Sequence, residues 1–269
     1  SGSIAASVAR LEIAPEKSPG VWVNGHQYRG TLRLFRRPGS EMVAVNALPL
    51  EEYVPSVVDG EMPASFPDEA RKAQAILART YALFRTAEAR AHPEFDLYAT
   101  TRSQNYPGVQ YRTSDGRRLA GESAASRRLT EETAGVVCTA EGRVFSTYYC
   151  AVCGGSTIDG RRVFSDAASV IQAVECDWCQ AAERYRWSAR ISREQASEAL
   201  ASHFQAKGEA IGSLTMLSSS DHAAPGPSKL FSASDGRRSR SVSAVELRRL
   251  MPGATLHSPF FTIRQEGDD

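Results

Sequence analysis

The clearest constraint on the fold is a long amphipathic helix predicted over residues 65–90. Ser65 can cap its N-terminus, Pro67 suits the first turn, and two acidic residues follow at the positive end of the helix dipole. Apolar residues then recur at helical spacing: Ala70, Ala73, Leu77, Tyr81 and Phe84. Because alanine adds little bulk, neighbouring elements can approach the helix backbone closely. We therefore expect a closely packed core helix.

Short strand-like segments precede this helix. Residues 21–23, 28–35 and 42–45 are alternating or apolar runs separated by turn residues, which predicts a small antiparallel sheet. A short helix is predicted from Leu50 to Asp59, ending at Gly60. These patterns predict an α+β fold in which small antiparallel sheets pack on one long central helix.

The second half of the chain continues this mixture of elements. A helix is predicted over residues 122–133, and a hairpin is predicted around Glu141-Gly142. Two short helices are predicted to begin at Ser192 and Ser243, where glutamine or glutamate three residues later completes a capping box.

The charge balance and the hydropathy of the sequence argue against a nucleic-acid-binding protein and against a membrane-spanning helix. The 269 residues contain 32 lysines and arginines and 31 aspartates and glutamates, so the net charge of +1 predicts no nucleic-acid partner. No apolar run approaches the ~18 residues of a membrane helix. The length allows one large domain or two small ones. Patterns such as G-x-S-x-G, H-E-x-x-H and the P-loop are missing from the sequence.

Glu61 is a candidate general acid. It lies between Gly60 and Pro63, with Met62 and Phe66 close by in the sequence. Apolar neighbours reduce the hydration of a carboxylate, which favours the protonated form that a general acid needs. The residues alone equally allow a loop glutamate that accepts backbone hydrogen bonds or stays solvated.

The region around Glu61 resembles a known family. The segment Leu50-x2-Tyr53-Val54-x6-Glu61-Met62-Pro63-x3-Pro67, followed by Ala70-x2-Ala73-Gln74-Ala75-x2-Ala78-Arg79-Thr80-Tyr81, is similar to the signature of the SpoIID family, also called the SpoIID/LytB or amidase-enhancer domain. Further similar stretches are Gln104-x-Tyr106-x-Gly108, Thr133-x-Gly135-x-Val137, Tyr148 to Thr157, Ser243 to Arg248 and Leu256 to Ile263.

The resemblance implies a domain organisation. It covers about residues 28–264, with residues 1–27 as an N-terminal extension with the first strands and residues 265–269 as a C-terminal tail. It also implies an extracytoplasmic protein that is secreted, periplasmic or anchored through a segment absent from this sequence.

The resemblance implies a lytic transglycosylase that acts on peptidoglycan glycan strands without a catalytic cofactor. The family's catalytic glutamate falls on Glu61, which would protonate the leaving oxygen and then accept the proton of the attacking C6 hydroxyl. The alternative is a non-catalytic peptidoglycan-binding or amidase-activating module, in which case a cell-wall amidase is the expected partner.

Four further residues are expected to line the substrate cleft. Gln104 and Tyr106 would bind sugar across the cleft from Glu61, unless their loop is packed only for its own sake. Arg79 and Tyr81 lie on the long helix. Arg79 would either bind near Glu61 or to the sugar, or form a buried ion pair.

The sequence departs from the family pattern at two points. Gly60 stands where many relatives have serine, which removes a hydroxyl that could orient Glu61. Cysteines also replace the more usual small or hydroxyl residues in the segment 149–155, before Gly154-Gly155.

The cysteines form two C-x2-C pairs, Cys150/Cys153 and Cys176/Cys179, separated by 22 residues. Four thiolates at this spacing predict a structural zinc site that staples residues 150–179. Disulfides between the pairs, or redox chemistry, are the alternatives. Cys138 lies in an apolar stretch and is expected to be a small buried residue.

Overall fold

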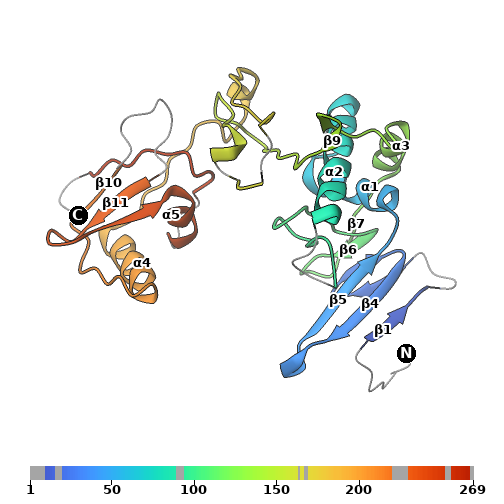
Figure 1. The fold of residues 1–269 in the computed structure, drawn as a ribbon, viewed down its shortest axis with the longest axis horizontal. Helices are drawn as coiled ribbons and strands as arrows, with labels where there is room; N and C mark the ends of the chain where they lie inside the picture. The colour runs from blue at the N-terminus through green and yellow to red at the C-terminus, as the bar shows by residue number, and fades with distance from the viewer. Residues whose placement is uncertain are drawn as a thin grey trace. The chain divides into compact units, whose positions relative to one another are not determined.

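Three helices form the centre of the N-terminal part of the chain in the computed structural model (Figure 1): α1 (Leu50–Glu61), α2 (Asp68–Glu88) and α3 (Ala124–Glu132). The structure describes residues 10–15, 20–88, 94–162, 164–166, 169–219, 230–251 and 256–266. The long predicted helix is present as α2, and its expected end near residue 90 lies outside the described residues.

The chain divides into two units, residues 1–151 with 157–174 and residues 152–156 with 175–269. The first unit contains α1 to α3 and nine strands. The second contains the later cysteines and the C-terminal elements. The single family domain predicted over residues 28–264 stays a prediction.

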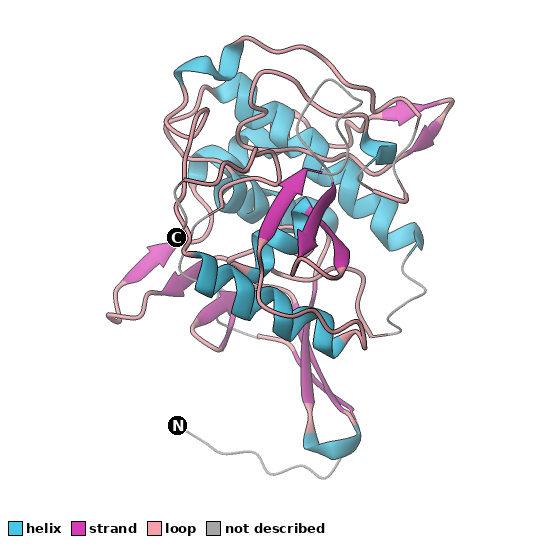
Figure 2. Cartoon of the chain, turned by 90° about the vertical axis from the view of Figure 1, so that its left-hand side faces the viewer, coloured by secondary structure: helices cyan, strands magenta, loops and turns pink. Residues whose placement is uncertain are grey.

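Among the described residues, the first unit contains three small antiparallel sheets. Figure 2 shows the strands of the chain in magenta. The first sheet has the order β1-β4-β5, the second the order β2-β3-β6-β7, and the third is the predicted hairpin of β8 and β9 around Glu141 and Gly142. The α+β class is therefore confirmed. The strand bounds are β1 (Arg10–Ile13), β2 (Val21–Val23), β3 (His26–Tyr28), β4 (Thr31–Arg36), β5 (Met42–Ala47), β6 (Gln110–Arg112), β7 (Arg118–Ala120), β8 (Thr139–Ala140) and β9 (Arg143–Val144).

The buried face of α2 differs from the predicted one. Ala75, Ala78 and Ala82 are buried, as close packing requires, whereas Ala73 is exposed. Two arginines share this buried face, Arg71 with 2% and Arg79 with 1% of its surface exposed. The predicted apolar face was therefore wrong at Ala73, and apolar periodicity alone does not identify charged residues that are buried through ion pairs.

Both arginines pair with carboxylates on α1. Arg79 donates from Nε and Nη2 to the two carboxylate oxygens of Glu51, each at 2.8 Å, and Arg71 pairs with Asp59. Hydrogen bonding from Arg79 lowers the pKa of Glu51 below its ordinary value. These pairs hold α1 against α2.

Helix α1 extends further than predicted. Gly60 does not end it, because the helix continues to Glu61 and the Met62 amide donates to the Val58 carbonyl at 3.0 Å. Pro55 lies inside the helix without interrupting it.

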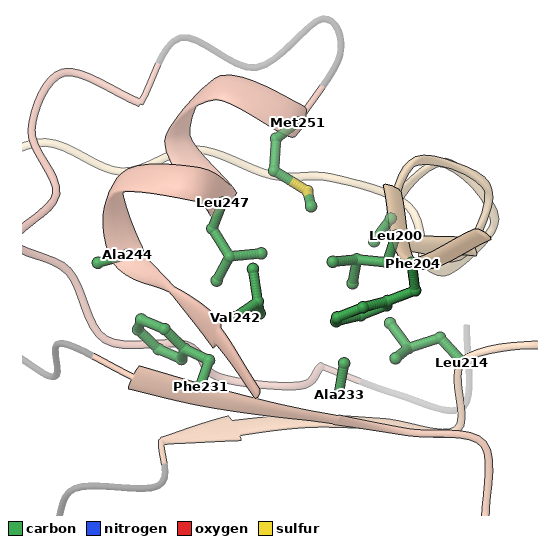
Figure 3. Packing of buried hydrophobic residues seen from close by; sticks show 10 residues of the cluster. Leu200, Phe204, Leu214, Phe231, Ala233, Val242, Ala244, Leu247 and Met251 are labelled. Carbon is green, nitrogen blue, oxygen red and sulfur yellow. The ribbon is translucent and has the colours of Figure 1, made fainter. Parts of the chain in front are cut away.

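The second unit has its own core. Helices α4 (Arg193–Ala206) and α5 (Ala244–Leu250) accompany an antiparallel sheet of β10 (Met216–Ser219), β11 (Leu230–Ser234) and β12 (Ser239–Ser243). Figure 3 shows their apolar side chains pointing toward one another; the labelled members are Leu200, Phe204, Leu214, Phe231, Ala233, Val242, Ala244, Leu247 and Met251. Single-turn 3-10 helices are η1 (Pro38–Ser40), η2 (Gly160–Arg162) and η3 (Trp178–Ala181).

Both predicted capping boxes are confirmed, at Ser192 with Gln195 and at Ser243 with Glu246. Among the described residues, none of the helices combines the length and the apolar character that crossing a membrane requires.

We expect Glu246→Gln to destabilise the second unit by up to about 1 kcal/mol at pH 7, because glutamine can still complete the capping box but loses the ion pair with Lys207. Glu246 accepts hydrogen bonds from Lys207 Nζ at 2.7 Å and from the Ser243 amide at 2.9 Å, and these lower its pKa to about 2. Because the folded pKa is below the unfolded value of about 4.3, the stabilisation is complete above pH ~4.3 and is lost as the pH falls towards 2.

Urea denaturation at several pH values measures this effect. The difference in unfolding free energy between the wild-type and variant proteins should shrink below pH ~4.3. A difference that stays constant down to acid pH would contradict the role of the Glu246 carboxylate.

Candidate active site around Glu61

Glu61 is the last residue of α1 and is half-buried. Its Oε1 accepts a hydrogen bond from the backbone amide of Asn105 at 2.6 Å. The side-chain Nδ2 of Asn105 also donates to the carbonyl of Gly60 at 2.7 Å. Asn105 therefore holds both the carboxylate and the end of the helix that carries it.

Asn105 belongs to residues 104–109, which we call the site loop. The site loop packs so closely on α1 that a Cβ at Gly60 would collide with the Asn105 carbonyl oxygen and would lie 2.9 Å from Pro107 Cδ. Ser56 Oγ of α1 donates to the carbonyl of Gly108 at 2.8 Å. The missing serine at position 60 is thus explained by packing, since this arrangement leaves no room for any side chain there.

Tyr149 is a second group at the carboxylate. Its phenol lies near enough to Glu61 for the carboxyl group to raise the pKa of Tyr149, and Gln104 Nε2 donates to the phenol oxygen at 3.4 Å. Burial, followed by the negative charge of Glu61, raises the pKa of Tyr149 far above its ordinary value. The phenol therefore stays protonated at neutral pH, so it keeps a proton that it could donate.

Sequence analysis did not identify Tyr149 as a site residue. It is 88 positions away from Glu61 along the chain, in the segment that resembles the family pattern from Tyr148 to Thr157. Its place in that segment could have identified Tyr149, but the segment was interpreted through its cysteines, as part of a metal site.

Gln104 and Tyr106 are close to the site but are buried, with 0% and 5% of their surfaces exposed. Gln104 Oε1 accepts from the Tyr53 hydroxyl at 3.1 Å, and the Tyr106 hydroxyl donates to Asn46 at 2.8 Å. Burial raises the pKa of both Tyr53 and Tyr106. These contacts favour a role in holding the site loop, and direct sugar binding by either residue stays a prediction.

Arg79 and Tyr81 are occupied elsewhere. Of the two interpretations of Arg79, the structure shows the ion pair, with Glu51 rather than Glu61 as the partner. Tyr81 is 5% exposed, and its hydroxyl accepts from Arg85 Nε at 3.2 Å. Sugar contact by these two residues therefore also stays a prediction.

Three of the four predicted metal ligands come together. The Sγ atoms of Cys153, Cys176 and Cys179 all lie within 4.8 Å of one another, whereas Cys150 is exposed and is not part of this group. Three of the four predicted ligands are therefore gathered, and the part of Cys150 in the metal site stays a prediction.

The cysteine cluster fits a metal better than a disulfide. None of the five cysteines forms a disulfide, and Sγ of Cys153 lies 3.5 Å from Sγ of Cys179, well beyond an S–S bond of ~2.05 Å. Thiolates bound to one zinc at about 2.3 Å would be about 3.8 Å apart. Burial raises the pKa of Cys153 to about 11, and a hydrogen bond from Cys153 lowers the pKa of Cys176.

Comparisons with known proteins cover the Glu61 region. Residues 39–139 match the family model SpoIID, described as stage II sporulation protein. A protein of Brachyspira hyodysenteriae without an assigned function is 32% identical over 191 residues, which are 71% of this chain and 49% of that protein.

Two further relatives carry the name stage II sporulation protein D. The protein of Bacillus subtilis is 28% identical and the one of Bacillus amyloliquefaciens 25% identical, and both alignments cover 53% of this chain and 43% or 42% of the relative. The chain thus spans about half the length of the curated relatives it matches.

Proposed function

Because this chain belongs to the SpoIID family, we propose that it is a peptidoglycan lytic transglycosylase. It would cleave the bond between N-acetylmuramic acid and N-acetylglucosamine and leave a 1,6-anhydro ring on the muramoyl sugar. The observation that carries the proposal is the half-buried Glu61 carboxyl, which accepts a hydrogen bond from the amide of Asn105 at 2.6 Å, with the phenol of Tyr149 nearby.

One carboxyl group is sufficient for this reaction. Protonated Glu61 gives its proton to the glycosidic oxygen as the bond from that oxygen to the anomeric carbon breaks. The resulting carboxylate accepts the proton of the C6 hydroxyl while the C6 oxygen attacks the anomeric carbon, which restores protonated Glu61. No water enters, so the second carboxylate that hydrolytic glycosidases use is not required.

The groups around Glu61 support the carboxylate that forms after the first proton transfer. The amide of Asn105 donates to Oε1 at 2.6 Å. The nearby phenol of Tyr149 would donate to the same carboxylate. Charge-assisted hydrogen bonds of this kind stabilise the anion, so they favour the step in which Glu61 loses its proton.

The cysteine cluster would hold a structural zinc ion through Cys153, Cys176 and Cys179. When bound, zinc would cross-link the loops that carry these thiolates. It has no part in the proton transfers proposed for Glu61.

A peptidoglycan substrate would determine where this protein works and which proteins it meets there. Peptidoglycan strands lie outside the cytoplasm, so the protein would work there. A cell-wall amidase would be a partner if the chain activates such an enzyme instead of cutting glycan itself.

We expect Glu61→Gln to lower the rate of anhydromuramoyl product formation by about 10²–10⁴-fold, because a carboxamide can neither give nor take the proton. Mass spectrometry of purified glycan strands after incubation measures the products. Exposed Glu131 is the matched control, and Glu131→Gln should retain the wild-type rate. Undiminished product formation by the Glu61 variant would refute the assignment and favour the non-catalytic module.

We expect Tyr149→Phe to lower kcat about tenfold or more with little change in KM, since it removes a donor to a charged group that acts during the reaction. Tyr148→Phe is the control, because that hydroxyl bonds to Asp166 instead of Glu61. Equal kcat losses in the two variants would mean that Tyr149 has only a structural role.

We expect about one zinc per chain by elemental analysis, with a lower melting temperature in a strong chelator because metal binding contributes to folding. Cys176→Ser should lose both the zinc and this chelator sensitivity, whereas Cys138→Ser should keep both, since Cys138 is outside the cluster. A metal-free wild-type protein, unaffected by chelator, would contradict the zinc site.

A further inference from the structure

One face of the sheet β2-β3-β6-β7 carries a tryptophan between two arginines. The guanidinium carbon of Arg112 on β6 lies 5.0 Å from the ring centroid of Trp22 on β2, and that of Arg118 on β7 lies 5.5 Å from it. Both arginines are exposed and Trp22 is partly exposed. We call these three residues the Trp22 patch.

The positive charge of the Trp22 patch is not neutralised by described residues. Arg112 and Arg118 lie directly opposite each other in the antiparallel register, where like charges repel. Among the ion pairs formed within the described part of the chain, none includes either arginine, whereas Arg117 of the same hairpin pairs with Asp115 at 2.7 Å. The four strands contain no aspartate or glutamate.

The sheet is attached to the active site through the site loop. The amide of Val109 donates to the carbonyl of Gln27 on β3 at 2.8 Å, and Nδ1 of His26 lies 2.9 Å from the carbonyl oxygen of Pro107. The same loop contains Asn105, whose amide binds Glu61. The Trp22 patch and Glu61 therefore belong to one unit of the structure.

We propose that the Trp22 patch binds a carboxylate carried on the sugar strand, at a subsite separate from Glu61. Paired guanidinium groups match a carboxylate in charge and hydrogen-bonding geometry. Both guanidinium groups lie over the indole of Trp22, and these cation–π contacts keep the two charges close to each other. The inference rests on the proposed function, which supplies the muramoyl glycan as the ligand.

Muramoyl glycan offers carboxylates from two sources. A peptide-free muramoyl residue ends its lactyl group in a carboxylate, and a peptide-bearing residue carries carboxylates on the stem peptide instead. A strand of N-acetylglucosamine alone has neither, so it is the neutral reference ligand.

Isothermal titration calorimetry on the full chain tests the site, with Glu61→Gln in every protein to prevent turnover. The probes are peptide-free muramoyl tetrasaccharide, its peptide-bearing form, and chitotetraose. Adding Arg112→Gln and Arg118→Gln should raise the Kd for at least one carboxylated probe about tenfold, since each exposed ion pair contributes up to about fivefold. The probe that responds identifies the source of the carboxylate.

Two controls make the result specific. Arg117→Gln should leave every Kd unchanged, because Arg117 is already paired with Asp115. Chitotetraose should bind the double-arginine variant as it binds the parent protein. Equal Kd values for parent and double variant with both carboxylated probes, or no binding of either probe to the parent, would overturn the subsite.

Product analysis of the wild-type protein distinguishes this failure from failure of the proposed function. If binding depends on Arg112 and Arg118 but no anhydromuramoyl products form, the proposed reaction is refuted and the proposed subsite is supported. Products formed without arginine-dependent binding would refute the subsite alone.

Discussion

Two buried arginines on α2 fix the position of α1, the helix that ends at Glu61 in the candidate active site. Arg71 and Arg79 are eight residues apart, as are their partners Asp59 and Glu51 on α1, so the two ion pairs set the register of an antiparallel helix pair. Leaving either buried guanidinium group without its counterion is costly, which disfavours any other register. The end of α1, and Glu61 with it, is held in place as a result.

The site loop completes the arrangement by packing where the helix has no side chain. Gly60 allows the backbone of Asn105 to come against α1, and the amide of that residue then reaches the Glu61 carboxylate. The serine that the family resemblance leads one to expect at this position would occupy the same space. Orientation of the carboxyl group, which a serine hydroxyl could provide elsewhere, comes here from a backbone amide and from the phenol of Tyr149.

Local patterns predicted the parts of this structure that depend on neighbouring residues. Helix α2 and the capping boxes at Ser192 and Ser243 follow from spacing, and the SpoIID resemblance pointed to Glu61. The partner of Arg79 and the contact of Tyr149 with Glu61 depend on tertiary packing between distant segments, which periodicity does not encode. The C-x2-C spacing predicted a cysteine cluster, and three of its four thiols are gathered.

The central claim is that this frame presents Glu61 to a glycosidic oxygen of muramoyl glycan. The most direct measurement is a crystal structure of the Glu61→Gln variant with an uncleaved muramoyl tetrasaccharide. The account predicts the oxygen of a muramoyl–glucosaminyl bond within about 3.2 Å of the side chain at position 61, with the C6 hydroxyl of the same muramoyl sugar on that side. A bound strand that keeps every glycosidic oxygen out of reach of that side chain would contradict it.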